Sequence, residues 1–172
     1  MEELRDKVYD WTSELINEGK LLQGLILMLA TWNFANFRYA MKTFPLDEFE
    51  KSLKKCDFDY FNDKNFEDTN LEDANIKSNV MRIYNELSKF KGVKYVGATK
   101  IMHFLCPKFF VMWDQKIREH YGFGTSAEEY YNFMNKMQTD YKEGKFKDLE
   151  KGVTIPRAID ISNLQFSDFK SE

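Results

Sequence analysis

The chain has 172 residues, of which 43% are hydrophobic and 31% are charged, and its formal net charge is −3. These values are typical of a soluble globular protein, built either as one domain over residues 1–172 or as two packed helical lobes. The small negative charge excludes a protein that binds polyanions indiscriminately. The longest apolar run, LLQGLILMLATW, is too short to span a bilayer, so no membrane partner is expected.

The two cysteines indicate reduced thiols and an intracellular protein. Cys56 and Cys106 lack CxxC spacing, so the sequence predicts neither a zinc site nor a redox pair. The acidic N-terminal run MEELRDKVYDW does not have the pattern of a signal peptide. We therefore expect a cytoplasmic protein, associated with the nucleoid or nucleus if it binds DNA. We expect no metal and no cofactor.

Helical periodicity dominates the first half of the chain. Apolar residues at helical spacing predict a helix over 4–15 and a largely buried second helix over 21–32. Aromatic residues over 34–41 predict a third helix, and 46–53 fits a short fourth helix with two acids in its first turn. The segment 56–75 is rich in Asn and Asp and lacks periodicity, so we expect a loop with one short helical turn.

The second half is also predicted to be helical. An apolar stripe predicts a helix over 80–90, and the run KGVKYVG then indicates a glycine-punctuated turn. The next helix is expected over 98–105, because Pro107 forces its end. Asp114 is expected to begin a further helix that ends at Tyr121.

The C-terminal part combines a capped helix with a tail. Ser126 and Glu129 have the spacing of a capping box, which predicts a helix with an apolar side. The run TIPRAIDIS contains Pro156, so we expect an extended tail that packs across the helices. No alternating strand pattern of useful length occurs. The predicted fold is all-α, a compact multi-helix domain with an extended C-terminal tail.

Residues 80–106 form a candidate helix-hairpin-helix motif, with its hairpin around Gly92 to Gly97. In such a motif, backbone N–H groups at a helix N-terminus hold a phosphate without a side chain. Positive charges outnumber negative ones between Lys89 and His120. That balance is compatible with local phosphate binding and equally with an ordinary solvated helix surface.

Three further runs carry a resemblance to a known family: LMLATWNFANFRYAMKTFPLDEF, VGATK and VMWDQKIREHYG. They resemble, in order, the early helix pair, the GVGxK hairpin and the aspartate segment of the helix-hairpin-helix DNA glycosylase superfamily, which includes endonuclease III and the 8-oxoguanine DNA glycosylases. The resemblance runs from about Leu27 to Gly122. By position, Lys100 matches the lysine nucleophile of bifunctional members, and Asp114 matches the aspartate of catalytic members. The resemblance implies a base-excision repair enzyme that acts on damaged double-stranded DNA, with or without AP-lyase activity.

The chemistry of that reaction sets a demand on Lys100. Breaking the bond between a base and deoxyribose builds positive charge on the sugar, which a carboxylate such as Asp114 stabilises. A neutral amine then attacks C1′ and forms a Schiff base. The lysine pKa must fall from about 10.4 towards neutrality, which costs about 4 kcal/mol. A helix N-terminus supplies only about 1 kcal/mol, so burial among apolar side chains must supply the rest.

Several residues near these two are candidates for DNA contacts. His103, on the same helical face as Lys100, is expected either to orient Lys100, contact a phosphate or exchange a proton, or to be an ordinary structural histidine. Trp32 is expected either to stack on an extruded base or to pack in the core. The predicted substrate-binding and DNA-binding residues are Lys94, Gly97, Thr99, His103, Trp32, Asn33, Asn36 and Trp113.

Two other functions stay open. In a non-catalytic helix-hairpin-helix DNA-binding protein, Lys94 and Lys100 contact phosphates and Asp114 only caps a helix. In an all-α interaction protein, the hairpin is incidental. The enzyme hypothesis makes one geometric demand, which is that the Lys100 amine and the Asp114 carboxylate face the same concave, aromatic-lined pocket.

Overall fold

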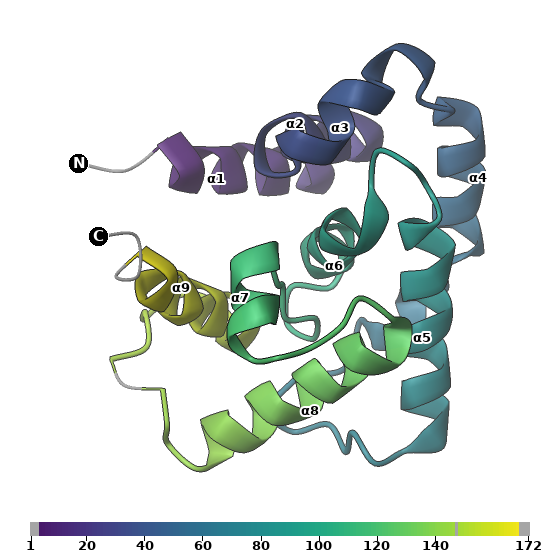
Figure 1. The fold of residues 1–172 in the computed structure, drawn as a ribbon. Coiled ribbons are helices and arrows are strands. Elements are labelled where there is room, and N and C mark those ends of the chain that lie inside the picture. The colour runs from purple at the N-terminus through teal and green to yellow at the C-terminus, as the bar shows by residue number, and fades with distance from the viewer. Residues whose placement is uncertain (1–3, 147, 169–172) are drawn as a thin grey trace.

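The computed structural model describes residues 4–146 and 148–168, and all regular structure in them is helical. The all-α prediction is therefore confirmed. The helices, labelled in Figure 1, are α1 (Leu4–Asn17), α2 (Leu21–Trp32), α3 (Phe34–Ala40), α4 (Leu46–Lys55), α5 (Ala74–Ser88), α6 (Lys94–Leu105), α7 (Gln115–His120), α8 (Ala127–Lys142) and α9 (Ile155–Asp168), with 3-10 turns η1 (Met41–Thr43) and η2 (Asp59–Phe61).

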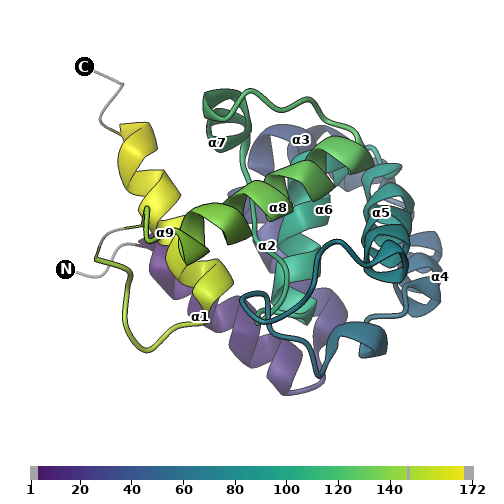
Figure 2. The same ribbon diagram turned by 90° about the horizontal axis from the view of Figure 1, so that it is seen from below.

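Helix α6 lies at the centre of the fold, surrounded by the other helices in both Figure 1 and Figure 2. Every residue from Val96 to Phe104 is buried. Its sequence is apolar on most of its circumference, and a helix of that kind is stable only inside a protein. Helix α5 packs against α6 and α8, while α1 packs against α2 and α6. The polar side chains between Val96 and Phe104, including Lys100, are thereby held in a desolvated place.

Among the described residues, side-chain caps begin α5, α7, α8 and α9, and two of these caps were predicted. At the start of α9, the Thr154 hydroxyl accepts a hydrogen bond from the Arg157 backbone N–H. The Asp114 carboxylate accepts a hydrogen bond from the Ile117 backbone N–H, 2.8 Å away, at the start of α7. The Ser126 hydroxyl accepts one from the Glu129 backbone N–H at the start of α8. Asp73 caps α5 in the same way. These bonds satisfy backbone donors that have no partner within a helix.

Helix α6 begins at Lys94, earlier than the predicted residue 98. The turn after α5 is therefore limited to residues 89–93, and Gly97 lies inside the helix. Its backbone N–H donates to the Val93 carbonyl at 3.1 Å. The prediction treated both glycines of KGVKYVG as turn residues, whereas Gly97 is a packing residue of the helix.

The C-terminal run TIPRAIDIS is helical from Ile155 onward, which corrects the expected extended tail. Pro156 occupies the first turn of α9, where a missing N–H removes no hydrogen bond and the fixed φ suits a helix. Ala158 and Ile159 are buried, and α9 packs against α7. Residues 169–172 lie outside the described residues. Within the described part of the chain, no helix has the length and apolarity to cross a membrane.

Candidate functional site

A pocket of about 370 Å³ brings Lys100 and Asp114 together. Lys100 reaches it from the middle of α6, whereas Asp114 comes from the segment just before α7. Helices α1 and α2 form the remaining walls, so the pocket is assembled from four separate segments. Its lining residues are Leu4, Arg5, Val8, Thr31, Trp32, Lys100 and Asp114.

Lys100 is only 8% exposed, although it carries an amine. Its Nζ donates a hydrogen bond to the Trp32 carbonyl at 2.6 Å and lies 5.6 Å from the centre of the Trp32 ring. Burial lowers the pKa of Lys100 to about 8, even though the negative charges of Asp160 and Asp114 oppose that shift. The amine at this position therefore loses its proton much more readily than an exposed lysine does.

Asp114 is half-buried at the rim of the pocket. Its Oδ1 is used in the cap of α7, at 2.8 Å from the Ile117 nitrogen. Its Oδ2 has no hydrogen-bond partner among residues 4–146 and 148–168. One carboxylate oxygen therefore fixes the orientation of the group, while the other is available to the pocket.

Trp32 forms the aromatic wall of the pocket and packs against two further rings. Its ring centre lies 5.9 Å from that of Tyr9 and 5.9 Å from that of Phe104. The guanidinium of Arg5 lies over its face at 5.5 Å. The Trp32 Nε1 is buried and has no hydrogen-bond partner among the described residues. A ligand with an acceptor atom would satisfy that donor.

Near the Trp32 ring, the buried residues Arg157 and Asp160 form an ion-pair network with the half-exposed Asp6, and the sequence analysis missed it. Arg157 of α9 pairs with Asp160 one turn later and with Asp6 of α1 at 3.2 Å. Its guanidinium also lies 4.3 Å from the centre of the Tyr9 ring. Burial raises the pKa of Asp160, and the positive charge of Arg157 opposes the rise. Arg157 and Asp160 are three residues apart, which brings two side chains together in a helix. The sequence analysis expected an extended tail here, so this spacing was not interpreted as an ion pair.

His103 has the structural role that was one of its two expectations, and its internal bonds argue against the other, a DNA contact. The ring is completely buried, with Nδ1 2.8 Å from the Phe110 carbonyl and Nε2 2.9 Å from the Tyr9 hydroxyl. A carbonyl only accepts, so Nδ1 carries the proton and Nε2 accepts from Tyr9. Burial lowers the pKa of His103 to about 4. A neutral ring with both nitrogens occupied has no free group for a phosphate.

Gly97 and Asn33 are also corrected from DNA contacts to packing residues. The backbone N–H of Gly97 is used within α6, so it cannot bind a phosphate. Asn33 is buried, and its Nδ2 donates to the carbonyls of Gly92 and Val93. Asn33 therefore holds the α5–α6 turn against the start of α3.

Thr99 and Trp113, two further predicted contacts, are fully buried in the core. The Thr99 hydroxyl donates to the Val96 carbonyl at 3.1 Å. The Trp113 Nε1 donates to the Tyr95 carbonyl at 3.3 Å. Both polar groups are thus satisfied inside the protein, which corrects the expectation that either touches DNA.

Lys94 and Asn36 remain accessible. Lys94 is exposed at the first position of α6, where its φ of 52° places it in the left-handed region. Asn36 is half-buried in α3, and its Nδ2 donates to the Asn33 Oδ1 at 3.2 Å. Of the predicted residues, the structure therefore brings Lys100, Asp114 and Trp32 together and leaves Lys94 and Asn36 outside their pocket.

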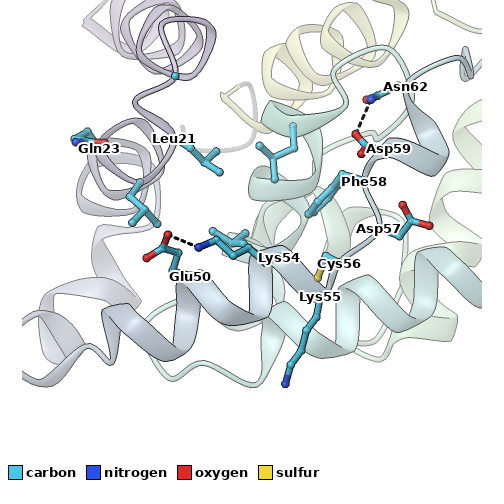
Figure 3. A pocket seen from close by; sticks show the side chains of 14 residues that line it. Leu21, Gln23, Glu50, Lys54, Lys55, Cys56, Asp57, Phe58, Asp59 and Asn62 are labelled. Carbon is cyan, nitrogen blue, oxygen red and sulfur yellow. Dashed lines mark hydrogen bonds and ion pairs between the residues drawn. The ribbon is translucent and has the colours of Figure 1, made fainter.

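A larger pocket of about 740 Å³ lies between the start of α2, the end of α4 and the segment that follows α4 (Figure 3). Three of its charged groups have partners, since Lys54 pairs with Glu50 at 2.8 Å and Asp59 accepts from Asn62 at 2.9 Å. Burial raises the pKa of the Cys56 thiol to about 11, so it is protonated at neutral pH. No desolvated amine and acid meet there, and the smaller pocket is the better candidate for catalysis.

Comparisons with protein-family models, with curated proteins and with solved structures found no match to this chain. Among the described residues, no three His, Cys, Asp or Glu side chains are grouped so that they could hold a metal ion.

Proposed function

We propose that this protein is a DNA glycosylase with AP-lyase activity, and that Lys100 and Asp114 carry the reaction. One observation carries the proposal, which is that both groups line one pocket beside the ring of Trp32. Burial of the amine is the physical condition that a lysine nucleophile needs. The resemblance of VGATK and VMWDQKIREHYG to the glycosylase superfamily assigns the same two residues by an independent route.

The pocket residues divide the reaction between them. The flipped base lies against Trp32, with C1′ of its sugar between Lys100 and Asp114. The neutral Lys100 amine uses its lone pair to bond C1′ as the C1′–N bond to the base breaks. The base leaves with the electron pair of that broken bond and takes a proton from the solvent. The bound amine then loses a proton, and its lone pair forms the C1′=N bond while the C1′–O4′ bond opens. O4′ keeps the electrons of that bond and takes up a proton, and the product is the protonated Schiff base. The Asp114 carboxylate stabilises the positive charge on the sugar.

The sugar must displace one existing contact as it enters. Lys100 Nζ is bonded to the Trp32 carbonyl at 2.6 Å, and the amine must turn away from that oxygen to reach C1′. The exchange is local, because Trp32 and Lys100 line the same pocket.

Borohydride trapping on duplex DNA with an abasic site tests the lyase step. The wild type is expected to form a covalent adduct and Lys100→Ala none, while Lys51→Ala, which removes an exposed lysine of α4, serves as the matched control. Because the reactive amine is neutral, the trapping rate should rise about tenfold per pH unit below pH 8 and level off above it. Absence of an adduct with the wild type would contradict the proposed lyase activity.

Release of bases from duplexes that carry oxidised, alkylated or deaminated bases tests the glycosylase step separately. The wild type is expected to release at least one class of base, and Asp114→Asn to lose that activity. If the wild type released none of these bases, the proposed glycosylase activity would be contradicted.

A non-catalytic DNA-binding protein is the second candidate. It is favoured by the fact that both groups already have structural partners, with Lys100 bonded to the Trp32 carbonyl and Asp114 capping α7. It predicts duplex binding that weakens with salt and is unchanged in Asp114→Asn, with no adduct and no base release.

A further inference from the structure

The outer surface of α3 carries exposed rings and a cation in contact with one another. Phe34 is 50% exposed and Tyr39 is 71% exposed. The guanidinium carbon of Arg38 lies 5.6 Å from the centre of the Phe34 ring and 4.5 Å from that of the Tyr39 ring. Its Nη2 also donates to the Tyr39 hydroxyl at 2.6 Å. We call the surface of Phe34, Arg38 and Tyr39 the α3 platform.

Further cations flank the α3 platform. Lys42 follows in η1, and Lys91 and Lys94 belong to the α5–α6 turn and the first position of α6. That turn lies against α3, since a Cβ atom at Gly92 would come within 2.9 Å of the Ala40 Cβ. All three lysines are exposed.

These cations have no internal counter-charge. The sequence from residue 33 to residue 45 contains no Asp or Glu. Within residues 4–146 and 148–168, none of Arg38, Lys42, Lys91 and Lys94 forms an ion pair. The platform therefore presents uncompensated positive charge around two exposed rings, and the charge-complementary partner is an anion with flat apolar faces.

We propose that the α3 platform binds a single strand of DNA. Its bases stack on Phe34 and Tyr39, and its phosphates lie along Arg38 and the flanking lysines. Every base has a face that stacks on an aromatic ring, so such binding tolerates any sequence, and the cations bind the backbone. A duplex keeps its base faces stacked on each other and cannot use the rings in this way.

Helix α3 begins two residues after Trp32, whose ring forms the wall of the Lys100 pocket, but no residue of the platform lines that pocket. The inference goes beyond the proposed base excision, because binding at the platform requires neither Lys100 nor Asp114.

Fluorescence anisotropy with a labelled oligothymidylate of about 15 nucleotides tests the proposal. The wild type is expected to bind at about 50 mM salt and more weakly at about 200 mM. Phe34→Ala with Tyr39→Ala should weaken binding by about tenfold or more, because two stacking rings are lost. Arg38→Ala should weaken binding and reduce the salt slope by about one.

Matched controls separate the platform from the rest of the surface. Trp11→Ala removes a ring of α1 that is 46% exposed, and Lys51→Ala removes an exposed lysine of α4; both should bind as the wild type does. The rings are exposed, so the double variant should keep the wild-type melting curve. If the double variant melts at a lower temperature than the wild type, the single variant Tyr39→Ala provides the test.

Five outcomes would overturn the proposal, of which four concern the variants and the DNA ligands. Those four are a wild type that does not bind the oligomer, a double variant with unchanged affinity, equal loss of affinity in Trp11→Ala, and a duplex that binds equally well and loses as much affinity in the double variant. Binding of oligouridylate more than about tenfold tighter would assign the surface to RNA instead, which would also overturn it. Failure of base release would leave these results unaffected.

Discussion

A Cβ atom at Gly97 would lie 2.8 Å from Nδ2 of Asn33. The amide of Asn33 cannot easily move away, because it donates to the Gly92 carbonyl at 2.9 Å and to the Val93 carbonyl at 3.0 Å. Helix α6 and the turn before it therefore meet the start of α3 at a contact with no room for a methyl group.

Gly97→Ala should destabilise the protein by about 1–3 kcal/mol, as overpacked core positions do. The expected loss comes in spite of the gain of about 1 kcal/mol that alanine normally brings to a helix. Urea unfolding measures the change. In the background of Asn33→Ala, which removes the nearest obstacle, the same substitution should cost less. Equal costs in both backgrounds would show that the contact with Asn33 is not what excludes the methyl group.

Asp114 has a structural and a proposed chemical role, and two substitutions separate them. Asp114→Ala should cost about 1 kcal/mol of stability, because α7 loses its cap. Asp114→Asn should stay within about 0.5 kcal/mol of the wild type, because Asn caps helices nearly as well as Asp. Both should lower base release at least about 100-fold if the carboxylate stabilises the transition state. If Asp114→Asn released bases at the wild-type rate, the only role of Asp114 would be to cap α7.

Burial of Lys100 should make stability depend on pH above pH 8. The unfolded lysine takes up a proton as pH falls below 10.5, whereas the folded one does so only near pH 8. The burial of Lys100 therefore does not lower the free energy of unfolding above pH 10.5. The free energy of unfolding decreases as the pH falls from 10.5 to 8 and is constant below pH 8. The full change is about 3 kcal/mol.

Urea unfolding of the wild type and Lys100→Met between pH 7 and pH 10.5 measures this contribution. The advantage of Lys100→Met should shrink as pH rises from 8 to 10.5, while other titrating groups cancel in the difference. Lys94→Met, at an exposed site, should show no such trend. Parallel curves for the wild type and Lys100→Met would mean that the folded amine is not desolvated.

The His103 imidazole should carry its proton on Nδ1 at neutral pH and stay neutral far below the usual histidine range. Its pKa of about 4, set by burial, predicts a titration midpoint near pH 4. Nitrogen-15 correlation spectra of the imidazole rings report both the tautomer and the midpoint, with His120→Gln used to assign the two histidines. A proton on Nε2, or a midpoint near 6.5, would contradict the buried, doubly bonded geometry.

Local signals predicted most helices well. Helices α2 and α8 follow from apolar periodicity, and the caps at Asp114 and Ser126 mark where α7 and α8 begin. Each signal lies within a few residues of the feature it predicts. The start of α6 was missed because Gly97 looks like a turn glycine unless its neighbour Asn33, far away in the sequence, is known.

The candidate site was predictable only in part. Lys100 and Asp114 were assigned through a resemblance, and the structure places them in one pocket. The wall contributed by Arg5 depends on how α1 packs, which no local pattern encodes. The pairing of Arg157 with Asp6 joins the two ends of the chain and is invisible to periodicity.

Arg157 links two segments that lie far apart in the sequence. It ties α9 to α1 through Asp6 and lies beside the Tyr9 ring, while the negative charge of Asp160 in the same helix opposes the fall in the Lys100 pKa. The electrostatic surroundings of the Lys100 amine are therefore complete only after α9 has docked beside α1.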